Sequence, residues 1–215
     1  NERTARLYTD FALLTSRDQL TYEAALFFNA ITGYSSVPVL RKLVMAPHSL
    51  KGRVIELIRR EAERSSPGAP GRIIAKMNSL CDPDVIGELY AASRAGVKID
   101  LIVRGICTVV PGVAGMSDTI NVVSILDRFL EHSRILYFAN GGAEEVYLSS
   151  GDWMPRNLTG RVELMFPIEQ PDLRKRLVAA LETYLADNTQ SHVLGTDGGY
   201  RRRRPAAGES VVRCQ

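Results

Sequence analysis

Short apolar runs alternate with amphipathic segments along most of this chain. Apolar stretches bounded by Gly, Pro or Asp predict strands, and apolar residues at helical spacing predict helices. In chain order, the pattern predicts a strand at 5–14, a helix after Ser16, a helix at 50–64, a strand at 72–77, a helix at 82–95, a strand at 97–103, a helix at 120–131, strands at 133–138, 145–149 and 161–166, and a helix at 172–186. This rhythm of strand, helix and strand is typical of an α/β fold, here a mixed sheet flanked by helices.

Two stretches interrupt the pattern and suggest domain limits. The segment Gly33–Pro38 is rich in Gly, Ser and Pro and separates the first predicted helix from the α/β region, which we place at residues 35–190. After Ser191 the chain contains a Gly-Gly pair and four consecutive arginines, and this composition predicts a disordered tail over 191–215. Because the chain opens inside a patterned element and without methionine, we expect it to be a piece of a longer protein.

Composition narrows the class of protein only a little. Hydrophobic residues make up 45% and charged residues 24% of the chain, which is ordinary for a globular protein, and no apolar run is long enough to span a membrane. Cys81, Cys107 and Cys214 are odd in number and lie in unrelated contexts, which favours a reducing, cytoplasmic compartment over a disulfide framework or a zinc site. The net charge of +3 is mild, although the run Arg201–Arg204 favours an anionic partner.

Candidate phosphate ligands stand where predicted strands end. Ligands of open α/β sheets bind beyond the carboxyl ends of the strands, and Arg104-Gly105 directly follows such a strand. A guanidinium there would grip a phosphate with two donors, whereas the alternative is a surface salt bridge. Lys76 and Asn78, at the end of the strand before it, would reach a phosphate or simply be solvated. The chain contains no Walker-type loop or kinase-type glycine loop, so any ATP is held in another way.

Two further pairs of polar residues, one of which includes His132, have the same spacing along the chain. His132 and Arg134 lie two apart at the start of a predicted strand and should share a face, as should Ser150 and Asp152 after the next strand. This arrangement resembles the phospholipase D superfamily, in which a histidine acts on phosphate and nearby polar groups neutralise and orient it. The alternative for His132 is a structural histidine, and for Tyr8 an aromatic residue that packs on the sheet. His48 and His192 have no partners in the sequence pattern.

Five longer motifs resemble the C-terminal half of the long-chain polyphosphate kinase family, over residues 1 to about 190. They are Asn1-Glu-Arg-Thr-Ala-Arg-Leu-Tyr-Thr-Asp-Phe-Ala-Leu-Leu-Thr15, Ile74-Ala-Lys-Met-Asn-Ser-Leu80, Leu101-Ile-Val-Arg-Gly-Ile-Cys107, Arg128-Phe-Leu-Glu-His-Ser-Arg134 and Val146-Tyr-Leu-Ser-Ser-Gly-Asp-Trp-Met-Pro-Arg-Asn157. The resemblance implies that residues 1–32 end one phospholipase D-like catalytic module and that residues 35–190 form the second.

The same resemblance implies a reaction and a site. It implies reversible transfer of the terminal phosphate of ATP to polyphosphate through a phosphohistidine, with Mg²⁺ as cofactor. The phosphorylated histidine and the magnesium ligands would lie upstream of Asn1, so this chain would hold no metal ligand and would be inactive alone. Tyr8, Arg104 and His132 match the family's nucleotide-contacting positions, with His132 catalytic.

Further expectations follow from the resemblance and leave two alternatives. Arg134, Ser150 and Asp152 would orient His132 and the phosphate. ATP or ADP and polyphosphate would be the partners of a cytoplasmic homo-oligomer, with membrane association left open. The alternatives are a phospholipase D-like phosphodiesterase, which needs no ATP, and a non-catalytic polyanion-binding module, which has no nucleotide preference.

Overall fold

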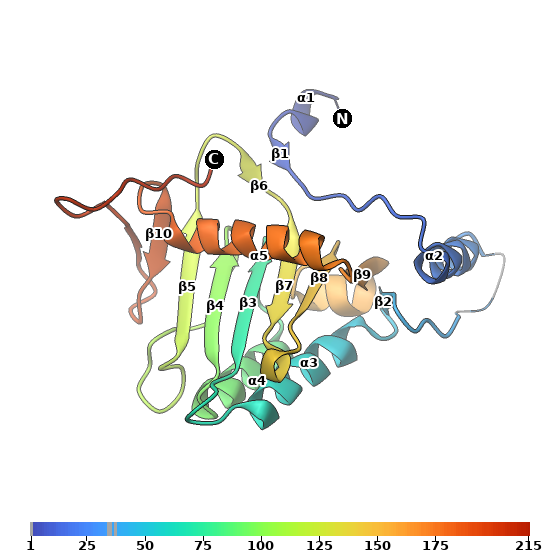
Figure 1. Cartoon of the computed structure of the whole chain (residues 1–215), viewed down its shortest axis with the longest axis horizontal. Coiled ribbons are helices and arrows are strands. Elements are labelled where there is room, and N and C mark those ends of the chain that lie inside the picture. The colour runs from blue at the N-terminus through green and yellow to red at the C-terminus, as the bar shows by residue number, and fades with distance from the viewer. Residues whose placement is uncertain (1, 34–35, 37) are drawn as a thin grey trace.

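A large mixed β-sheet carries helices on both of its faces (Figure 1). The computed structural model describes residues 2–33, 36 and 38–215. The predicted break at Gly33–Pro38 therefore lies partly outside the described residues. Within the described ranges, no helix combines the length and the hydropathy needed to cross a membrane.

The described residues form helices, strands and two short helical turns that alternate along the chain. They are α1 (Glu2–Ala5), β1 (Tyr8–Thr9), α2 (Asp18–Ile31), β2 (Val44–Ala46), α3 (Leu50–Arg64), β3 (Arg72–Met77), α4 (Pro83–Arg94), β4 (Lys98–Val103), β5 (Ile120–Ile125), β6 (Leu130–Glu131), β7 (Arg134–Phe138), η1 (Asn140–Gly142), β8 (Glu145–Ser149), η2 (Arg156–Gly160), β9 (Glu163–Pro167), α5 (Pro171–Ala186), β10 (Ser191–Leu194) and β11 (Tyr200–Arg202).

The main sheet mixes a parallel centre with antiparallel edges. Its strand order is β11-β10-β5-β4-β3-β7-β8-β9-β2, and β3, β4 and β5 run parallel to one another. Met77 pairs with Val103, so β3 and β4 end at the same edge of the sheet. Because β7 runs antiparallel to β3, with Lys76 opposite Ile135, its first residue Arg134 lies at this same edge. Three strand ends therefore meet where the sequence placed its candidate residues.

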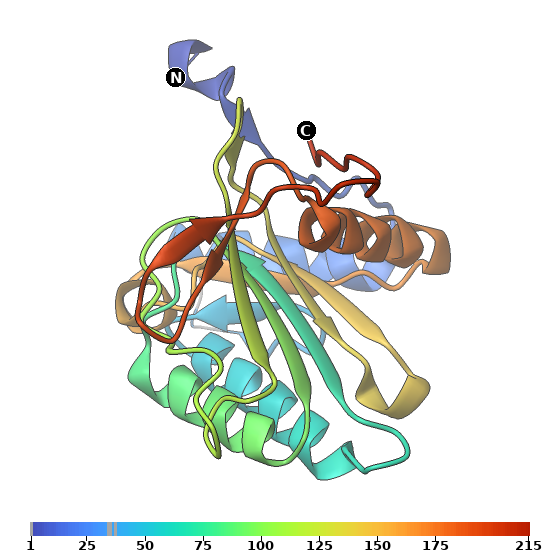
Figure 2. The ribbon, with the colours of Figure 1, turned by 90° about the vertical axis from the view of Figure 1, so that its left-hand side faces the viewer.

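Figure 2 shows the sheet between α3 and α4 on one face and α5 on the other. Two hydrophobic cores join it to these helices. The first core joins one face of the sheet to α3 and α4, with fully buried Val54, Leu57 and Leu89 among its members. The second joins the other face to α5 through Leu177, Leu181 and Tyr184. A sheet covered on both faces needs strands that are apolar on both sides, which explains the nearly continuous apolar runs of β3 and β4.

Local signals fix the position of α4, which the sequence predicted. The Asp82 carboxylate accepts hydrogen bonds from the backbone N–H groups of Asp84 (3.1 Å) and Val85 (3.2 Å), and Pro83 occupies the first helical position. Gly96, with φ of +84°, ends the helix in the left-handed conformation that favours glycine. The predicted helices at 50–64 and 172–186 and the strands at 72–77, 97–103, 133–138 and 145–149 are also confirmed, within a few residues.

The helix predicted over residues 120–131 is wrong. Residues 120–125 form β5, which pairs in parallel with β4, and 130–131 form the short strand β6. Four of the six β5 residues are β-branched, and this composition suits a buried strand; they are Ile120, Val122, Val123 and Ile125. A short apolar run of this kind cannot be assigned to a strand or a helix from its periodicity alone.

The tail predicted to be disordered is also ordered where it follows α5. β10 pairs antiparallel with β5, and β11 pairs with β10, so residues 191–202 extend the main sheet. Burial opposes ionisation of Asp187, but backbone N–H groups of Gln190, Cys214 and Thr189 donate to its carboxylate and lower its pKa to about 2. Arginines of the 201–204 run also fasten the hairpin, since Arg203 donates to the carbonyl of Leu185 at 2.7 Å. Polar contacts fix this segment together with Leu194, which joins the first hydrophobic core, and Val193, which packs against the second.

The N-terminal segment differs from prediction as well. Instead of a strand over 5–14, the chain forms the short helix α1 and the two-residue strand β1, and then continues without regular structure to α2. β1 pairs in parallel with β6, with Tyr8 beside Leu130 and Thr9 beside Glu131. Figure 1 shows these two strands side by side beyond the edge where β3 and β4 end. The pairing brings Tyr8 next to the residues that precede β7.

Candidate active site

His132 lies at the edge where β3 and β4 end, between β6 and β7. Its Nδ1 is 2.8 Å from the Asp10 carboxylate, and its ring meets the Tyr8 ring edge-on with centroids 4.9 Å apart. Its backbone N–H donates to the carbonyl of Thr9 at 3.1 Å. A carboxylate that accepts from Nδ1 selects the imidazole tautomer and fixes the ring plane, with Nε2 beside the guanidinium of Arg134. The histidine side chain keeps 30% of its surface exposed, so a ligand can reach it.

Arg134 connects His132 to Asp152. Its Nη1 lies 3.1 Å from Nε2 of His132, and its Nε donates to the Asp152 carboxylate at 3.1 Å. The same carboxylate oxygen accepts the backbone N–H of Asn78 at 2.8 Å, which ties it to the end of β3. The structure thus brings together three of the predicted residues, with a cation beside the imidazole and a buried carboxylate that holds the cation.

Arg104 faces the same edge with its terminal nitrogens free of protein acceptors. Its Nε donates to Oδ1 of Asn78 at 2.6 Å and to the carbonyl of Glu131 at 2.9 Å. No other hydrogen bond or ion pair of Arg104 occurs within the described residues. Burial lowers the pKa of this guanidinium below its usual value, and the neighbouring charge of Arg134 acts in the same direction. Arg104 and Arg134 are two neighbouring cations whose terminal nitrogens contact no carboxylate of the described residues. Such a pair favours an anionic ligand.

Gly105 allows the backbone behind Arg104 to approach the end of β3. Its N–H donates to the carbonyl of Asn78 at 2.7 Å. A Cβ at this position would lie 2.8 Å from that carbonyl oxygen and 3.0 Å from Oγ of Ser79. A side chain there would therefore push the two strand ends apart, which explains why glycine follows Arg104.

A buried charge network supports the residues on either side of His132. The Glu131 carboxylate lies 3.3 Å from Nζ of Lys76, and it accepts hydrogen bonds from Thr9 (3.2 Å) and Gln215 (2.6 Å). Lys76 also donates to the hydroxyl of Ser133 (2.8 Å) and to its carbonyl (3.1 Å). Lys76 and Glu131 are only 1% and 4% exposed. Lys76 therefore holds the peptide before and after His132 from inside the protein.

Tyr184 of α5 completes this network from the other side. Nζ of Lys76 lies 4.8 Å from the centroid of its ring. Burial and a hydrogen bond to Glu131 raise the pKa of the Tyr184 phenol far above its usual value. The sequence left Lys76 and Asn78 as phosphate ligands or solvated side chains, and the second interpretation is wrong because both residues are buried and paired.

The titration of Lys76 predicts a pH-dependent contribution to stability. Burial lowers its pKa from 10.5 to about 8, against the opposing attraction of Glu131; Arg104, Asp10 and Tyr184 also face it. Between these two values the unfolded chain keeps a proton that the native chain releases, so this group makes folding more favourable as the pH rises through that window. We expect the gap in thermal midpoint between the parent and Lys76→Met to widen from about pH 8 to about pH 10. A gap that does not change with pH would contradict this assignment.

Ser150 does not join the cluster. Its hydroxyl donates to the Glu163 carboxylate at 2.5 Å and accepts the backbone N–H of Leu164 at 2.9 Å. In the part of the chain that the structure describes, it contacts neither His132 nor Arg134. The expectation that Ser150 orients His132 therefore finds no supporting contact, whereas Asp152 does contact Arg134.

This difference gives a prediction for a matched pair of variants. Ser150→Ala should leave the transfer rate within about twofold of the parent and cost roughly 0.5–1.5 kcal/mol of stability from its lost hydrogen bonds. Asp152→Ala should slow transfer much more, because it releases Arg134. Initial rates and thermal midpoints of both variants test this. A Ser150→Ala enzyme as slow as Asp152→Ala would return Ser150 to the site.

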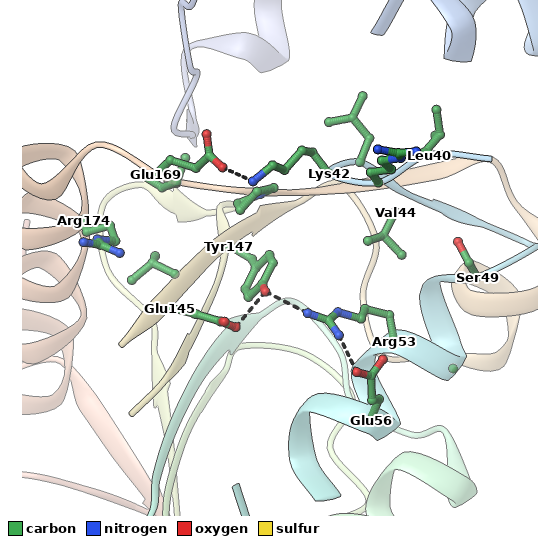
Figure 3. Close-up of a pocket in the computed structure, with 16 residues that line it drawn as sticks. Leu40, Lys42, Val44, Ser49, Arg53, Glu56, Glu145, Tyr147, Glu169 and Arg174 are labelled. Atoms are coloured by element: carbon green, nitrogen blue, oxygen red, sulfur yellow. Dashed lines mark hydrogen bonds and ion pairs between the residues drawn. The ribbon is translucent and has the colours of Figure 1, made fainter. Parts of the chain in front are cut away.

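A wide cavity of about 890 Å³ opens elsewhere, between α3, β8 and the turn before α5 (Figure 3). Its charged groups largely pair with one another. Nζ of Lys42 and the Glu169 carboxylate are 2.5 Å apart. The Tyr147 hydroxyl donates to Glu145 at 2.8 Å and accepts a hydrogen bond from Arg53 at 3.3 Å. None of the residues predicted from the sequence to form the site lines this cavity. We therefore place the candidate active site at the His132 edge.

Asp10 and Glu131 are residues of the site that sequence reasoning missed. Asp10 lies in the same motif as Tyr8, and Glu131 directly precedes His132, so the motifs contain both residues without indicating their roles. Their contacts span large distances in the chain: Thr9 and Glu131 are 122 positions apart. Sequence reasoning supplied only their positions within motifs. Their contacts arise from the pairing of β1 with β6.

The fold resembles that of phospholipase D enzymes. The chain superposes on a phospholipase D family member, Nuc from Salmonella typhimurium, with a TM-score of 0.51 and 15% identity over 75% of this chain and 97% of that one. At this identity the likeness concerns the fold alone. It defines an α/β domain with a phospholipase D-like fold.

A match to a family model specifies the family. The family model "Polyphosphate kinase C-terminal domain 2" matches residues 43–215, including the tail that the sequence motifs did not cover. The chain belongs to the polyphosphate kinase family.

Curated and solved relatives agree with this assignment. The chain is 53% identical over 215 residues to a polyphosphate kinase of Synechocystis sp., and 52% identical over 211 residues to that of Pseudomonas aeruginosa. These matches include 100% and 98% of this chain but only 30% and 31% of the relatives. The crystal structure of polyphosphate kinase from Porphyromonas gingivalis superposes with a TM-score of 0.88 and 38% identity, over 93% of this chain and 31% of that one. The chain thus spans about a third of the length of the relatives it matches.

Proposed function

We propose that this chain supplies the second phospholipase D-like catalytic module of a polyphosphate kinase, which reversibly transfers the terminal phosphate of ATP to polyphosphate through a phosphohistidine. The observation that carries the proposal is the placement of His132 between Tyr8 and Arg134, with Arg104 held beside it and its terminal nitrogens free. Family membership supports the reaction, and the geometry supports the roles of these residues.

The proposed chemistry needs charge neutralisation and a proton more than it needs further covalent steps. A histidine outside this chain attacks the γ-phosphorus, and the bond from that phosphorus to the ADP oxygen breaks. Arg104 and Arg134 bind the phosphate oxygens, and His132 donates a proton to the leaving oxygen or stabilises its charge. Tyr8 packs on or hydrogen-bonds the nucleotide. Asp152 keeps Arg134 in place, and Asp10 keeps the imidazole in its plane.

Magnesium is part of the proposal but receives no ligand here. The described residues contain no group of three or more His, Cys, Asp or Glu side chains placed to hold a metal ion. Bound Mg²⁺ would neutralise charge on the nucleotide phosphates. The steps assigned to His132, Arg104 and Arg134 use only the groups of this chain. Homo-oligomer formation and a cytoplasmic location remain predictions of the family resemblance.

One assay separates the proposed function from its rivals. A protein of the relatives' length that carries this chain is incubated with ADP and polyphosphate, and ATP formation is measured. Cleavage of a model phosphodiester without ATP would instead indicate the phosphodiesterase, which the fold likeness to Nuc favours. Salt-sensitive polyphosphate binding without nucleotide preference or turnover would indicate a polyanion-binding module.

A further inference from the structure

A second, smaller cavity of about 180 Å³ is lined by Arg104 but not by His132. Its walls come from the end of β4, from β5 and its following residue, and from the C-terminal hairpin β10–β11. The lining residues are Arg104, Gly105, Ser124, Leu126, His192 and Tyr200. Sequence reasoning assigned the hairpin to a disordered tail and found no partner for His192, so this cavity was not predicted.

Strand pairing explains why three of these side chains converge. His192 of β10 lies directly opposite Ser124 of β5, and side chains of residues opposite one another project from the same face of a sheet. Tyr200 of β11 lies opposite Leu194, which is two residues from His192 and so shares its face. Ser124, His192 and Tyr200 therefore project from one face of three adjacent strands, toward Arg104 at the end of β4.

Several side-chain polar groups of the lining residues lack partners among the residues that the structure describes. Arg104 uses only its Nε for protein acceptors, and the hydroxyls of Ser124 and Tyr200 make no hydrogen bond to any residue the structure describes. Nδ1 of His192 is buried and unpaired. A buried N–H without an acceptor is rarer than a buried lone pair without a donor, which favours the tautomer with its proton on Nε2. His192 then offers a donor to a ligand.

The chemistry of this lining fits a phosphate group. It contains one permanent cation and several hydrogen-bond donors, and no carboxylate. Phosphate oxygens only accept hydrogen bonds, and arginine binds them with two parallel donors. The volume is well below the roughly 300–1,000 Å³ of clefts that enclose a whole small-molecule ligand. The cavity therefore admits one end of a substrate, and Arg104 is the wall it shares with the His132 site.

We propose that this pocket is a phosphoryl subsite, in which Ser124, His192 and Tyr200 bind the phosphate next to the one held between Arg104 and His132. The inference rests on the proposed function, because it extends that site by one phosphate. The neighbouring phosphate comes from the polyphosphate chain or from the nucleotide, and both present the same oxygens to the pocket. Ordering of the β10–β11 hairpin then has a functional role, since it supplies two of the three residues.

Substrate kinetics distinguish the two sources. The double variant His192→Gln/Tyr200→Phe is made in a protein of the relatives' length. Its matched control is His48→Gln/Tyr22→Phe, which makes the same two substitutions at exposed positions. We expect the KM of one phosphate substrate to rise roughly tenfold or more, because hydrogen bonds to charged groups are lost, while kcat falls much less. A rise confined to polyphosphate assigns the subsite to that chain, and a rise confined to ADP assigns it to the nucleotide. Unchanged KM values for both substrates would overturn the proposal.

A binding measurement keeps the result independent of turnover. Calorimetric titration with tripolyphosphate and with ADP is carried out on the parent, the control, the double variant and Ser124→Ala, which tests the pocket without touching the hairpin. Weaker binding of either probe to both pocket variants supports the subsite, and unweakened binding of both probes rejects it. If the parent itself forms no ATP from ADP and polyphosphate, the proposed function fails, and the titration still reports on the pocket.

Discussion

Replacing His132 with alanine is expected to slow polyphosphate-dependent ATP formation by roughly 10²–10⁴-fold, the usual contribution of a positioned general acid or base. The loss should appear in kcat, because in this direction the imidazole acts on the ADP oxygen that attacks phosphorus, while Arg104 and Arg134 continue to bind phosphate. Its 30% exposure and its few contacts, mainly to Asp10 and Tyr8, imply little loss of stability.

The control for this variant is His48→Ala, which removes an exposed imidazole far from the Arg104 edge in the sequence and outside both cavities described here. Initial rates over a range of ADP concentrations, with thermal midpoints of each protein, separate chemistry from folding. Parent-like turnover in His132→Ala would remove this residue from the mechanism. A collapse of the thermal midpoint would instead assign it a structural role.

Local signals made part of the fold predictable. The limits of α4 could be predicted because each is marked locally. Asp82 and Pro83 favour a helix start, and Gly96 favours a helix end. β5 was not, because a strand buried in the centre of a sheet loses the alternation that marks an exposed one. The order of 191–202 was hidden for a related reason: its arginines and glycines resemble a solvated tail until β5 offers a strand edge.

The candidate site divides in the same way. Tyr8, Arg104 and His132 could be found because each stands in a motif that resembles a family, and the structure places them at one edge. The supporting roles of Glu131 and Lys76 could not be predicted, since they depend on contacts between segments far apart in the chain. A buried lysine has the same letter in the sequence as a solvated one, and only the packing of Tyr184 and Ser133 around it shows the difference.

Breaking the Lys76–Glu131 pair should be the most destabilising single change at the site. Lys76→Met leaves the Glu131 carboxylate, only 4% exposed, without its cation, and removal of one partner of a buried pair costs roughly 3–5 kcal/mol. Hydrogen exchange of peptides that cover residues 130–138 measures this locally, within a protein of the relatives' length. We expect exchange there to accelerate by roughly 10²–10⁴-fold, if it proceeds through opening of this region. Lys42→Met, which breaks a surface pair with Glu169, is the matched control and should have little effect.

The double variant Lys76→Met/Glu131→Gln separates stability from positioning. Removing both charges leaves no uncompensated ion, so much of the lost protection should return. Turnover should not return with it, because Lys76 also donates to the carbonyl and hydroxyl of Ser133, and methionine cannot. These bonds hold the peptide that carries His132, and a displacement of that imidazole by a fraction of an ångström changes its distance to the reacting ADP oxygen. A double variant with restored protection and restored kcat would show that the pair contributes only to folding.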